Sequence, residues 1–243
     1  MARSCERGHR NARTQTDTGT VMAVTTSGTP AGAAGWLTAA DPRQVVLVIP
    51  CSAAKSLGGQ PRAAAAGSQG EPWPEALLSA RAGVLGRSDA DMSRVMPAWR
   101  RYQGGFYRHA RPALGEAAAA GNLVIISGGY GLADACEPIG WYDKVLRLAD
   151  WPPGLLESAL TERARKASVD LVVGFAATSS SYAYLLRRTR WRHAGLQACL
   201  VTITGVTGGA MAEVPRRLGL AFAAFWNQQH DGYPPGTEVQ PLS

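Results

Sequence analysis

The feature that most constrains this chain is an uninterrupted apolar run at residues 45–49 (VVLVI), followed at once by Pro50. Such a run, rich in β-branched residues, is typical of a strand buried on both faces of a parallel sheet. Pro50 has no N–H for the strand ladder, so we expect the strand to end there. In the turn that follows, residues 51–55 (CSAAK), every side chain except that of Lys55 is small. Because ligands of open α/β sheets bind at the carboxyl ends of the strands, this turn predicts the floor of a pocket.

Three more apolar runs end in small residues in the same way, at 122–127, 170–174 and 198–204. Segments with helical spacing alternate with these runs. They cover 75–85, 96–120 with breaks at Gly104-Gly105 and Pro112, 155–167, 182–188 and 212–227. Strands that alternate with helices predict an α/β fold, a single domain with a mainly parallel central sheet flanked by helices. The strand ends should then gather at one edge of the sheet.

The predicted domain spans residues 36–232. Residues 1–35 are rich in Thr, Ser, Gly and Arg, a composition that cannot offset its ordering entropy, so we expect a disordered tail. We expect residues 233–243 to be an irregular tail. The Ala-, Gly- and Pro-rich stretch 60–74 is long for a connection and is interpreted as a mobile lid or binding loop.

Charge and composition narrow the class of partner. The chain has 25 Lys and Arg against 18 Asp and Glu, a formal net charge of +7, which suits a polyanion such as DNA. No apolar run approaches the roughly 18 residues of a membrane span, and no signal-peptide core is present, so we expect a soluble cytoplasmic protein. The four cysteines lack metal-ligand spacing, and no Walker or GxGxxG motif is present, so we expect neither metal nor cofactor. The oligomeric state is left open.

The segment 127–143 (SGGYGLADACEPIGWYD) combines glycines, aromatics and acids in one expected loop. A flat ring held by aromatic side chains beside a carboxylate is how a base-processing enzyme holds an extruded nucleobase. The alternative is that the aromatics belong to the core and the acids cap turns. The residues predicted to bind substrate are Cys51, Ser52, Ser127, Gly129, Tyr130, Gly131, Trp141 and Tyr142.

Three motifs carry a resemblance to a known family. They are 51–55 (CSAAK), 101–107 (RYQGGFY) and the segment 127–143, and together they resemble the YaaA family of peroxide-stress proteins. The motif PCSAAK is also similar to the Pro-Cys-x-x-x-Lys signature of archaeosine synthase, although Ser56-Leu57 stands where that family has Pro-Tyr. The resemblance implies a connection with nucleic acid or nucleobases. The order of strands and loops is also similar to uracil-DNA-glycosylase-like folds, as an analogy of architecture.

Candidate catalytic groups follow from the chemistry of N-glycosidic bond cleavage, which develops oxocarbenium character on the sugar. A carboxylate can stabilise that charge and orient a water molecule. Asp143 is the first candidate and Asp134 the second. Lys55 could bind a phosphate, assist the leaving base, or attack the sugar as an amine if burial lowers its pKa. Cys51 is more simply a small structural cysteine than a nucleophile.

Two clusters of basic and aromatic residues predict a track for the phosphate backbone, because arginine neutralises phosphates and aromatic rings stack on bases. A solvated surface is the alternative for each cluster. The GVTGGA turn at 205–210 could also present backbone amides to a phosphate. The residues predicted to contact nucleic acid are Arg100, Arg101, Tyr107, Arg108, Arg187, Arg188, Arg190 and Arg192.

Three functions are consistent with these patterns. The first is a DNA N-glycosylase that removes a damaged or modified base from a duplex in which that base is extruded, in repair or in defence against modified foreign DNA. The second is a non-catalytic DNA-binding stress protein of the same fold. The third is an enzyme that acts on a free nucleobase or nucleoside. The first prediction requires Lys55 and Asp143 to share one aromatic-walled hollow near an arginine-lined groove.

Overall fold

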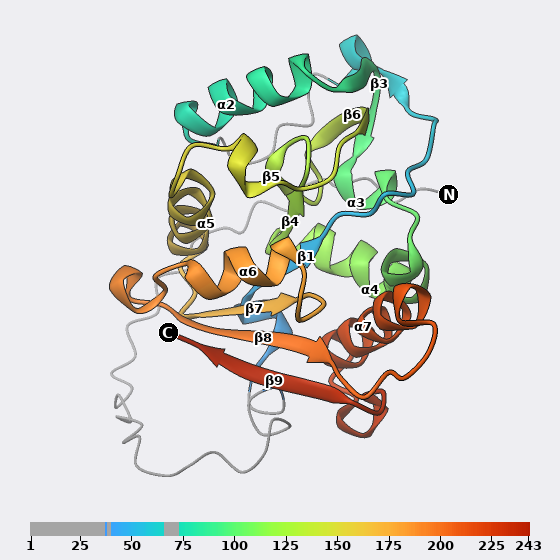
Figure 1. The fold of residues 1–243 in the computed structure, drawn as a ribbon, viewed down its shortest axis with the longest axis vertical. Helices are drawn as coiled ribbons and strands as arrows, with labels where there is room; N and C mark the ends of the chain where they lie inside the picture. Colours follow the sequence, from blue (N-terminus) through green and yellow to red (C-terminus); the bar gives the residue numbers. More distant parts are fainter. Residues whose placement is uncertain (1–36, 38–39, 66–72) are drawn as a thin grey trace, which may run out of the picture.

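The computed structural model describes residue 37 and residues 40–65 and 73–243, which form one α/β domain (Figure 1). The main sheet has six strands in the order β5-β4-β1-β7-β8-β9. Four neighbouring strands are parallel: β1 (Val46–Pro50), β4 (Leu123–Ser127), β7 (Leu171–Phe175) and β8 (Gln197–Ile203). The edge strands are antiparallel to their neighbours: β5 (Gly131–Asp134) and β9 (Thr237–Leu242). The predicted fold class and the parallel core are confirmed.

Strand β1 lies in the middle of this sheet, bonded to β4 on one side and to β7 on the other. Its side chains alternate between the two faces, so Val46 and Val48 pack in one core while Leu47 and Ile49 pack in the other. All four side chains are fully buried. The strand is apolar at every position because it has no face toward water.

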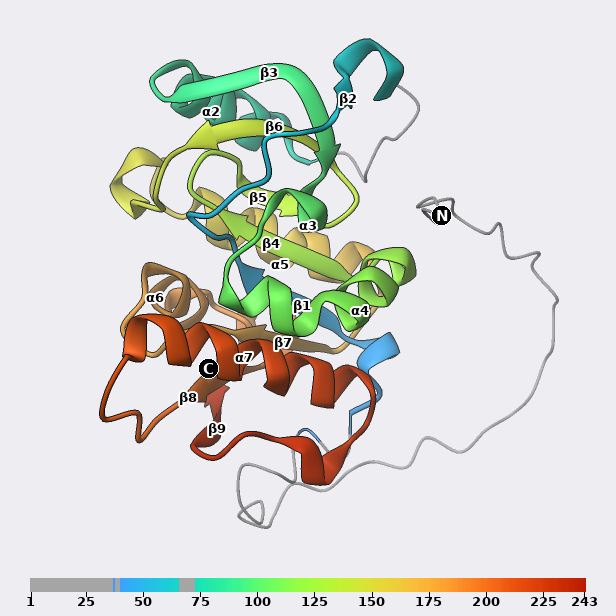
Figure 2. The ribbon, with the colours of Figure 1, turned by 90° about the vertical axis from the view of Figure 1, so that its right-hand side faces the viewer.

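Helices cover both faces of the sheet. On one face, α4 (Gly105–Ala120) and α7 (Ala210–Trp226) lie side by side (Figure 2) and share a core with Leu47 and Ile49. The other core contains residues of α2 (Glu75–Gly86), α5 (Leu155–Lys166) and α6 (Ser181–Arg188). Pro112 lies inside α4 without breaking it; the carbonyl that loses its partner belongs to the exposed Arg108, where water can reach it.

A second, three-stranded antiparallel sheet is made of β2 (Gln60–Pro61), β3 (Asp89–Pro97) and β6 (Pro138–Asp143). It corrects two expectations. The segment 127–143, expected as a loop, contains β5 and β6. The stretch 96–120, expected to be helical with breaks at Gly104-Gly105 and Pro112, begins with the end of β3 and the one-turn helix α3 (Ala98–Arg101). Residues 89–94 of β3 are mostly polar and solvent-exposed, so this strand lacks the apolar pattern that identified the central strands.

The expected irregular tail is also wrong in part, because residues 237–242 form β9 along the edge of the main sheet. The disordered tail predicted for residues 1–35, and residues 66–72 of the predicted lid, lie outside the described residues. No helix in the described part of the chain is long and apolar enough to cross a membrane.

Candidate functional site

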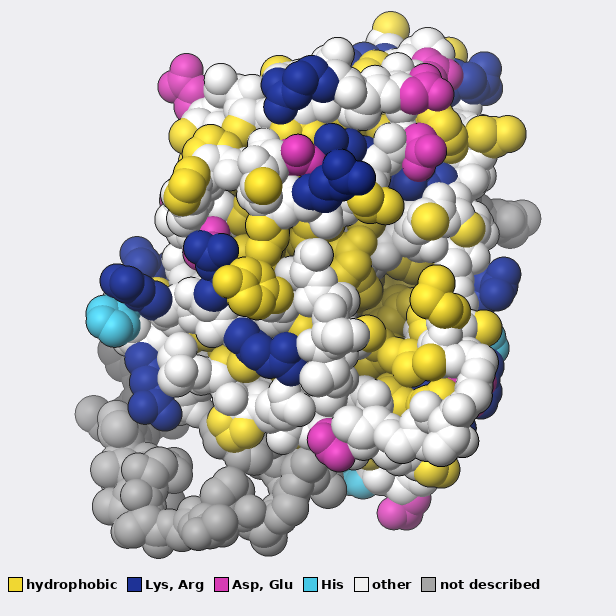
Figure 3. Space-filling model, viewed as in Figure 1, with side chains coloured by type: hydrophobic (Ala, Val, Ile, Leu, Met, Phe, Trp, Pro, Cys, Tyr) yellow, Lys and Arg dark blue, Asp and Glu magenta, His cyan; other side chains and the backbone are white. Residues whose placement is uncertain are grey.

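The carboxyl ends of β1, β4, β7 and β8 meet at one edge of the sheet. From β1 the chain first moves to β4 on one side and later returns to β7 on the other, so the end of β1 is the switch point at which α/β sheets form ligand crevices. Helices α4, α6 and α7 all begin at this edge (Figure 1). Figure 3 shows a depression lined by hydrophobic side chains on this face, below β3 and β6 and above α6 and α7.

Lys55 lies at the end of the turn after β1. Its backbone forms a bridge with Tyr102, and its Nζ lies 4.4 Å from the centre of the Tyr142 ring. Burial lowers the pKa of Lys55, while the nearby Cys51 thiol and Asp143 carboxylate act in the opposite direction. The Lys55 amine therefore lies within electrostatic reach of both Cys51 and Asp143.

Beneath Lys55 lies a buried network of hydroxyl groups. The Tyr142 hydroxyl is 2.8 Å from the Tyr102 hydroxyl and 2.7 Å from Ser127 Oγ, and Ser127 Oγ also accepts a hydrogen bond from the Tyr130 backbone N–H at 3.0 Å. Burial raises the pKa of both tyrosines well above its ordinary value, so the hydroxyls stay neutral. The network holds the Tyr142 ring in place under the lysine.

Cys51 is half-buried, and its Sγ lies 3.2 Å from the hydroxyl of Tyr182 in the first turn of α6. Burial raises the pKa of Tyr182 far above its usual range, so this partner is a neutral hydroxyl and not a base. Ser52 contacts the start of α4, where a Cβ on Gly104 would collide with Ser52 Oγ. Cys51 and Ser52 thus lie between the end of β1 and the starts of α6 and α4.

The glycines after β4 allow tight packing within the protein. A Cβ on Gly129 would meet the Tyr142 ring at 2.7 Å, and one on Gly131, which has φ +69°, would meet Trp151 at 2.8 Å. Gly129 and Gly131, which were predicted to contact substrate, instead pack against aromatic side chains of the protein.

Tyr130 and Asp134 also have structural roles. The Tyr130 hydroxyl accepts a hydrogen bond from the Gly140 N–H at 2.8 Å, and the Arg81 guanidinium lies 5.2 Å from its ring centre. Asp134 pairs in register with Val124 at the amino end of β4 and forms a buried ion pair with Arg163 at 2.9 Å. Asp134 thus lies at the edge of the sheet opposite Lys55, and its candidacy as a catalytic acid is corrected.

Arg101, predicted to contact nucleic acid, is only 1% exposed. Its Nη1 donates to the carbonyls of Ser56 and Gly58 at 2.6 and 2.9 Å, and its Nη2 donates to those of Arg94 and Ile139 at 3.1 and 3.0 Å. The guanidinium therefore joins the loop after β1 to the second sheet, and this prediction is corrected. Tyr107, also predicted to contact nucleic acid, is buried and donates its hydroxyl to the Pro50 carbonyl at 2.8 Å.

The other predicted basic residues divide between the two edges of the sheet. Arg100, next to the ring of Trp99, and the exposed Arg108 lie around the start of α4, near Lys55. The second cluster lies at the end of α6 and in the turn before β8, at the opposite edge, except that the Arg187 guanidinium reaches back to the loop after β7. Within it, Arg187 bonds to Thr178 and Gln240, Arg188 pairs with Glu157, and Arg190 and Arg192 are exposed. The two clusters do not form one groove beside Lys55.

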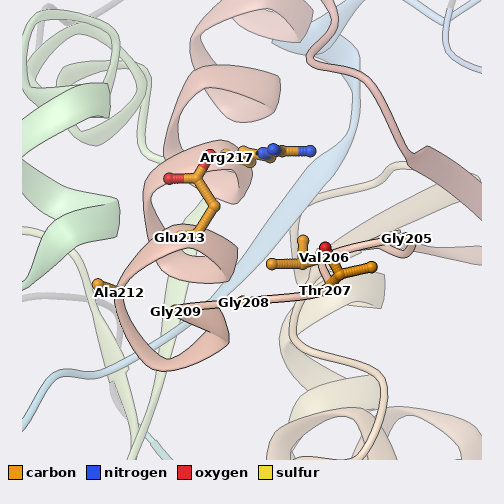
Figure 4. A pocket seen from close by; sticks show the side chains of 8 residues that line it. All are labelled: Gly205, Val206, Thr207, Gly208, Gly209, Ala212, Glu213 and Arg217. Atoms are coloured by element: carbon orange, nitrogen blue, oxygen red, sulfur yellow. Dashed lines mark hydrogen bonds and ion pairs between the residues drawn. The ribbon is translucent and has the colours of Figure 1, made fainter.

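The GVTGGA turn lines a separate hollow at the start of α7 (Figure 4). Glu213 lies in the first turn of the helix and forms ion pairs with Arg216 and Arg217, both at 2.6 Å. These arginines lower the pKa of Glu213 to about 2, so an ionised carboxylate paired with Arg216 and Arg217 lines the same hollow as the turn. A phosphate bound at the predicted turn would have this carboxylate as a neighbour.

Two tyrosines of the crevice were not among the predicted site residues. Tyr102 follows Arg101 in the RYQGGFY motif, and Tyr182 opens α6 directly after the serine turn that ends β7. Tyr182 follows a serine turn, and Tyr102 precedes the Gly104-Gly105 pair that opens α4. These small neighbours are the sequence signal that could have identified them.

Comparison with known proteins finds no match: no family model, no curated protein and no solved structure is similar to this chain. The resemblance to the YaaA family stays a prediction from the three motifs. The function proposed below depends on the residues and geometry of this chain.

Proposed function

We propose that this protein is an enzyme that cleaves the N-glycosidic bond of a nucleoside unit, with a damaged or modified base in DNA as the substrate. The observation that carries the proposal is the position of the Lys55 amine against the Tyr142 ring, within electrostatic reach of Cys51 and Asp143, at the switch point of the parallel sheet. A carboxylate and a cation with a lowered pKa are groups that can assist this reaction. The Tyr142 ring is fully buried and supports Lys55.

In the proposed reaction the bond between the sugar C1′ and the base nitrogen breaks, and its electron pair leaves with the base. The Asp143 carboxylate stabilises the oxocarbenium ion and accepts a proton from the water that attacks C1′. Lys55 protonates or hydrogen-bonds the departing base. Because burial lowers the pKa of Lys55, its ammonium group is a stronger acid than an exposed lysine.

Two features support DNA as the substrate: the formal charge of +7, and the placement of Arg100 and Arg108 near the start of α4 at the same edge of the sheet. A second candidate is an enzyme of a free nucleobase or nucleoside. It is favoured by the use of Arg101 and Arg187 for internal hydrogen bonds, which reduces the basic surface below that expected from sequence.

The test is release of free base, measured by chromatography, from duplexes with different modified bases and from the matching free nucleosides. We expect release from DNA by the wild-type protein and its loss in Lys55→Met and Asp143→Asn. Matched controls are Lys166→Met, which removes an exposed lysine of α5, and Asp170→Asn, at the amino end of β7. Both should retain activity.

Release from nucleosides but not from DNA would favour the second candidate. No release from any substrate, or full activity in both site variants, would contradict cleavage at this site. Borohydride reduction during turnover separates the two roles of Lys55. A covalent adduct on the protein would show that the amine attacks C1′, whereas its absence, with active enzyme, agrees with proton donation.

A further inference from the structure

A second cavity lies beside the Lys55 site, between the loop after β1 and the sheet of β3 and β6. Its volume is about 280 Å³, just below the range of about 300–1,000 Å³ typical of sites for drug-sized ligands. This size suits a single flat heterocycle. The cavity is lined by Leu57, Gly58, Asp91, Arg94, Arg101 and Trp141.

The wall formed by the loop is held rigidly. Arg101 binds the carbonyls of Ser56 and Gly58, on either side of Leu57, and the Ser56 N–H donates to the Arg101 carbonyl at 2.7 Å. Leu57 is nevertheless 78% exposed. Leu57 is therefore an apolar, solvent-exposed side chain on a rigid backbone. Such a side chain is suited to contact with a ligand, because binding orders little more of the chain and so costs little conformational entropy.

The polar groups of the cavity match the edge of a nucleobase. Asp91 accepts from the Ser93 N–H and hydroxyl, both through Oδ1, and these bonds lower its pKa, so the carboxylate is an ionised acceptor. Arg94 is oriented by a hydrogen bond from its Nε to the Gly59 carbonyl at 3.0 Å. The Nε of Arg101 is a buried donor that has no hydrogen-bond partner within the described residues.

Trp141 adds an aromatic side chain on which a base can stack. It precedes Tyr142 in β6, so the two side chains point to opposite faces of the strand. On the loop, Leu57 is two residues beyond Lys55, a separation of at most about 7 Å along the chain. Successive nucleotides of a duplex strand rise by about 3.4 Å, so one strand can reach both sites. Leu57 stands at the boundary, where apolar side chains commonly wedge between bases.

We propose that this cavity binds a second nucleobase, one or two positions from the base processed at Lys55, and that it prefers bases with an exocyclic amino group. The preference follows from Asp91, which can accept a hydrogen bond from the amino group of cytosine, adenine or guanine, whereas thymine has none to offer. The inference rests on the proposed function and specifies its substrate as a nucleic acid strand.

The test is equilibrium binding of fluorescein-labelled single-stranded dC7 and dT7, measured by anisotropy, so that no turnover is required. The wild-type protein should bind dC7 more tightly than dT7. Trp141→Ala should weaken dC7 binding by about 5- to 150-fold, the range for loss of one base stack. Trp141→Phe should retain most of the affinity, and Asp91→Asn should abolish the preference for dC7.

Matched controls are Tyr184→Ala, which removes an aromatic ring exposed on α6, and Asp231→Asn, which removes an exposed carboxylate far along the chain. Both should bind as the wild type does. Lys55→Met should keep the preference for dC7. If the wild type binds neither strand, or if Trp141→Ala and Asp91→Asn bind both strands unchanged, the inference is overturned. Intact binding with no base release would instead contradict the proposed reaction alone.

Discussion

The charge of Lys55 is subject to opposing influences from its surroundings. Burial disfavours its charged form, while the Tyr142 ring beside it and the electrostatic influence of Cys51 and Asp143 favour that form. The charge at this position opposes stability, because an uncharged side chain of similar length would fill the space without a desolvation penalty. In the proposed function, the charge serves the chemistry.

We expect Lys55→Met to raise the free energy of unfolding at pH 7. The pKa of the folded lysine lies below the ordinary 10.5 because burial disfavours the ammonium form, so desolvation of the amine opposes folding at pH 7. As the pH rises from the folded pKa toward 10.5, the folded state loses its proton first and the penalty disappears. The gain from methionine should therefore be smaller at pH 10 than at pH 7.

Urea denaturation of wild type and variant at several pH values measures this difference. Lys166→Met is the control, because its amine forms an exposed ion pair with Glu162, and its effect should stay small across the range. A stability gain from Lys55→Met that is equal at pH 7 and pH 10 would show that burial of the charge is not the cause.

At the scale of elements, the site is assembled from a loop and two sheets that belong to different parts of the chain. The loop after β1 has few apolar contacts of its own, and Leu57 is exposed. Its position depends on Arg101, which follows β3 in the one-turn helix α3 and binds four carbonyls of the loop, β3 and β6. This arginine links the Lys55 crevice to the second cavity.

We expect Arg101→Met to destabilise the protein by about 1–3 kcal/mol. It leaves the buried Ile139 carbonyl without its donor, and a buried unsatisfied group costs about 1–3 kcal/mol. The carbonyls of the exposed residues Gly58 and Arg94 can bind water instead. Arg101→Lys should not restore stability, since a lysine cannot reproduce the planar fork. Urea denaturation measures the loss. Hydrogen exchange at the amides of Ser56 and Gln103, which pair with the carbonyls of Arg101 and Ala54, should accelerate in the variant.

The control is Arg100→Met, which removes a partly exposed guanidinium beside the Trp99 ring and should change stability by no more than about 0.5 kcal/mol. Equal effects of the two variants would indicate that the four hydrogen bonds of Arg101 are not what holds the loop.

At the scale of the whole molecule, the basic residues are distributed over both edges of the sheet. Arg100 and Arg108 lie beside the crevice, whereas Arg190 and Arg192 lie in the turn between α6 and β8 at the far edge. A formal net charge of +7 attracts a polyanion to the molecule in general. Only the residues near the crevice can contact the phosphates of a strand bound at Lys55.

We expect the double variant Arg100→Gln/Arg108→Gln to bind duplex DNA more weakly and to reduce the slope of log affinity against log salt by about 2. Each phosphate contact contributes about 0.9 to that slope. The control double variant Arg190→Gln/Arg192→Gln removes the same charge at the opposite edge and should leave the slope nearly unchanged. Titrations at several salt concentrations compare them, and equal slopes for both variants would indicate binding without a defined track.

The parts of the fold that could be predicted are those in which burial alone determines which type of residue occupies each position. The runs at β1, β4, β7 and β8 are apolar throughout because both faces of each strand are covered, and their small terminal residues marked the edge that carries the site. The second sheet could not be predicted, because much of β3 is polar and exposed and its pairing with β6 is a contact between distant segments.

The sequence by itself determined the fold class, the central strand and the identity of Lys55 as a charged group at its end, because hydrophobic burial and the missing N–H of proline act locally. Only the tertiary structure decided the use of each polar residue. Asp143 lies near Lys55 while Asp134 pairs with Arg163 at the opposite edge, and Arg101 binds carbonyls instead of solvent or phosphate. The role of a charged side chain depends on the groups that desolvate and neutralise it. Those groups come from distant parts of the chain, so the sequence around the residue does not reveal them.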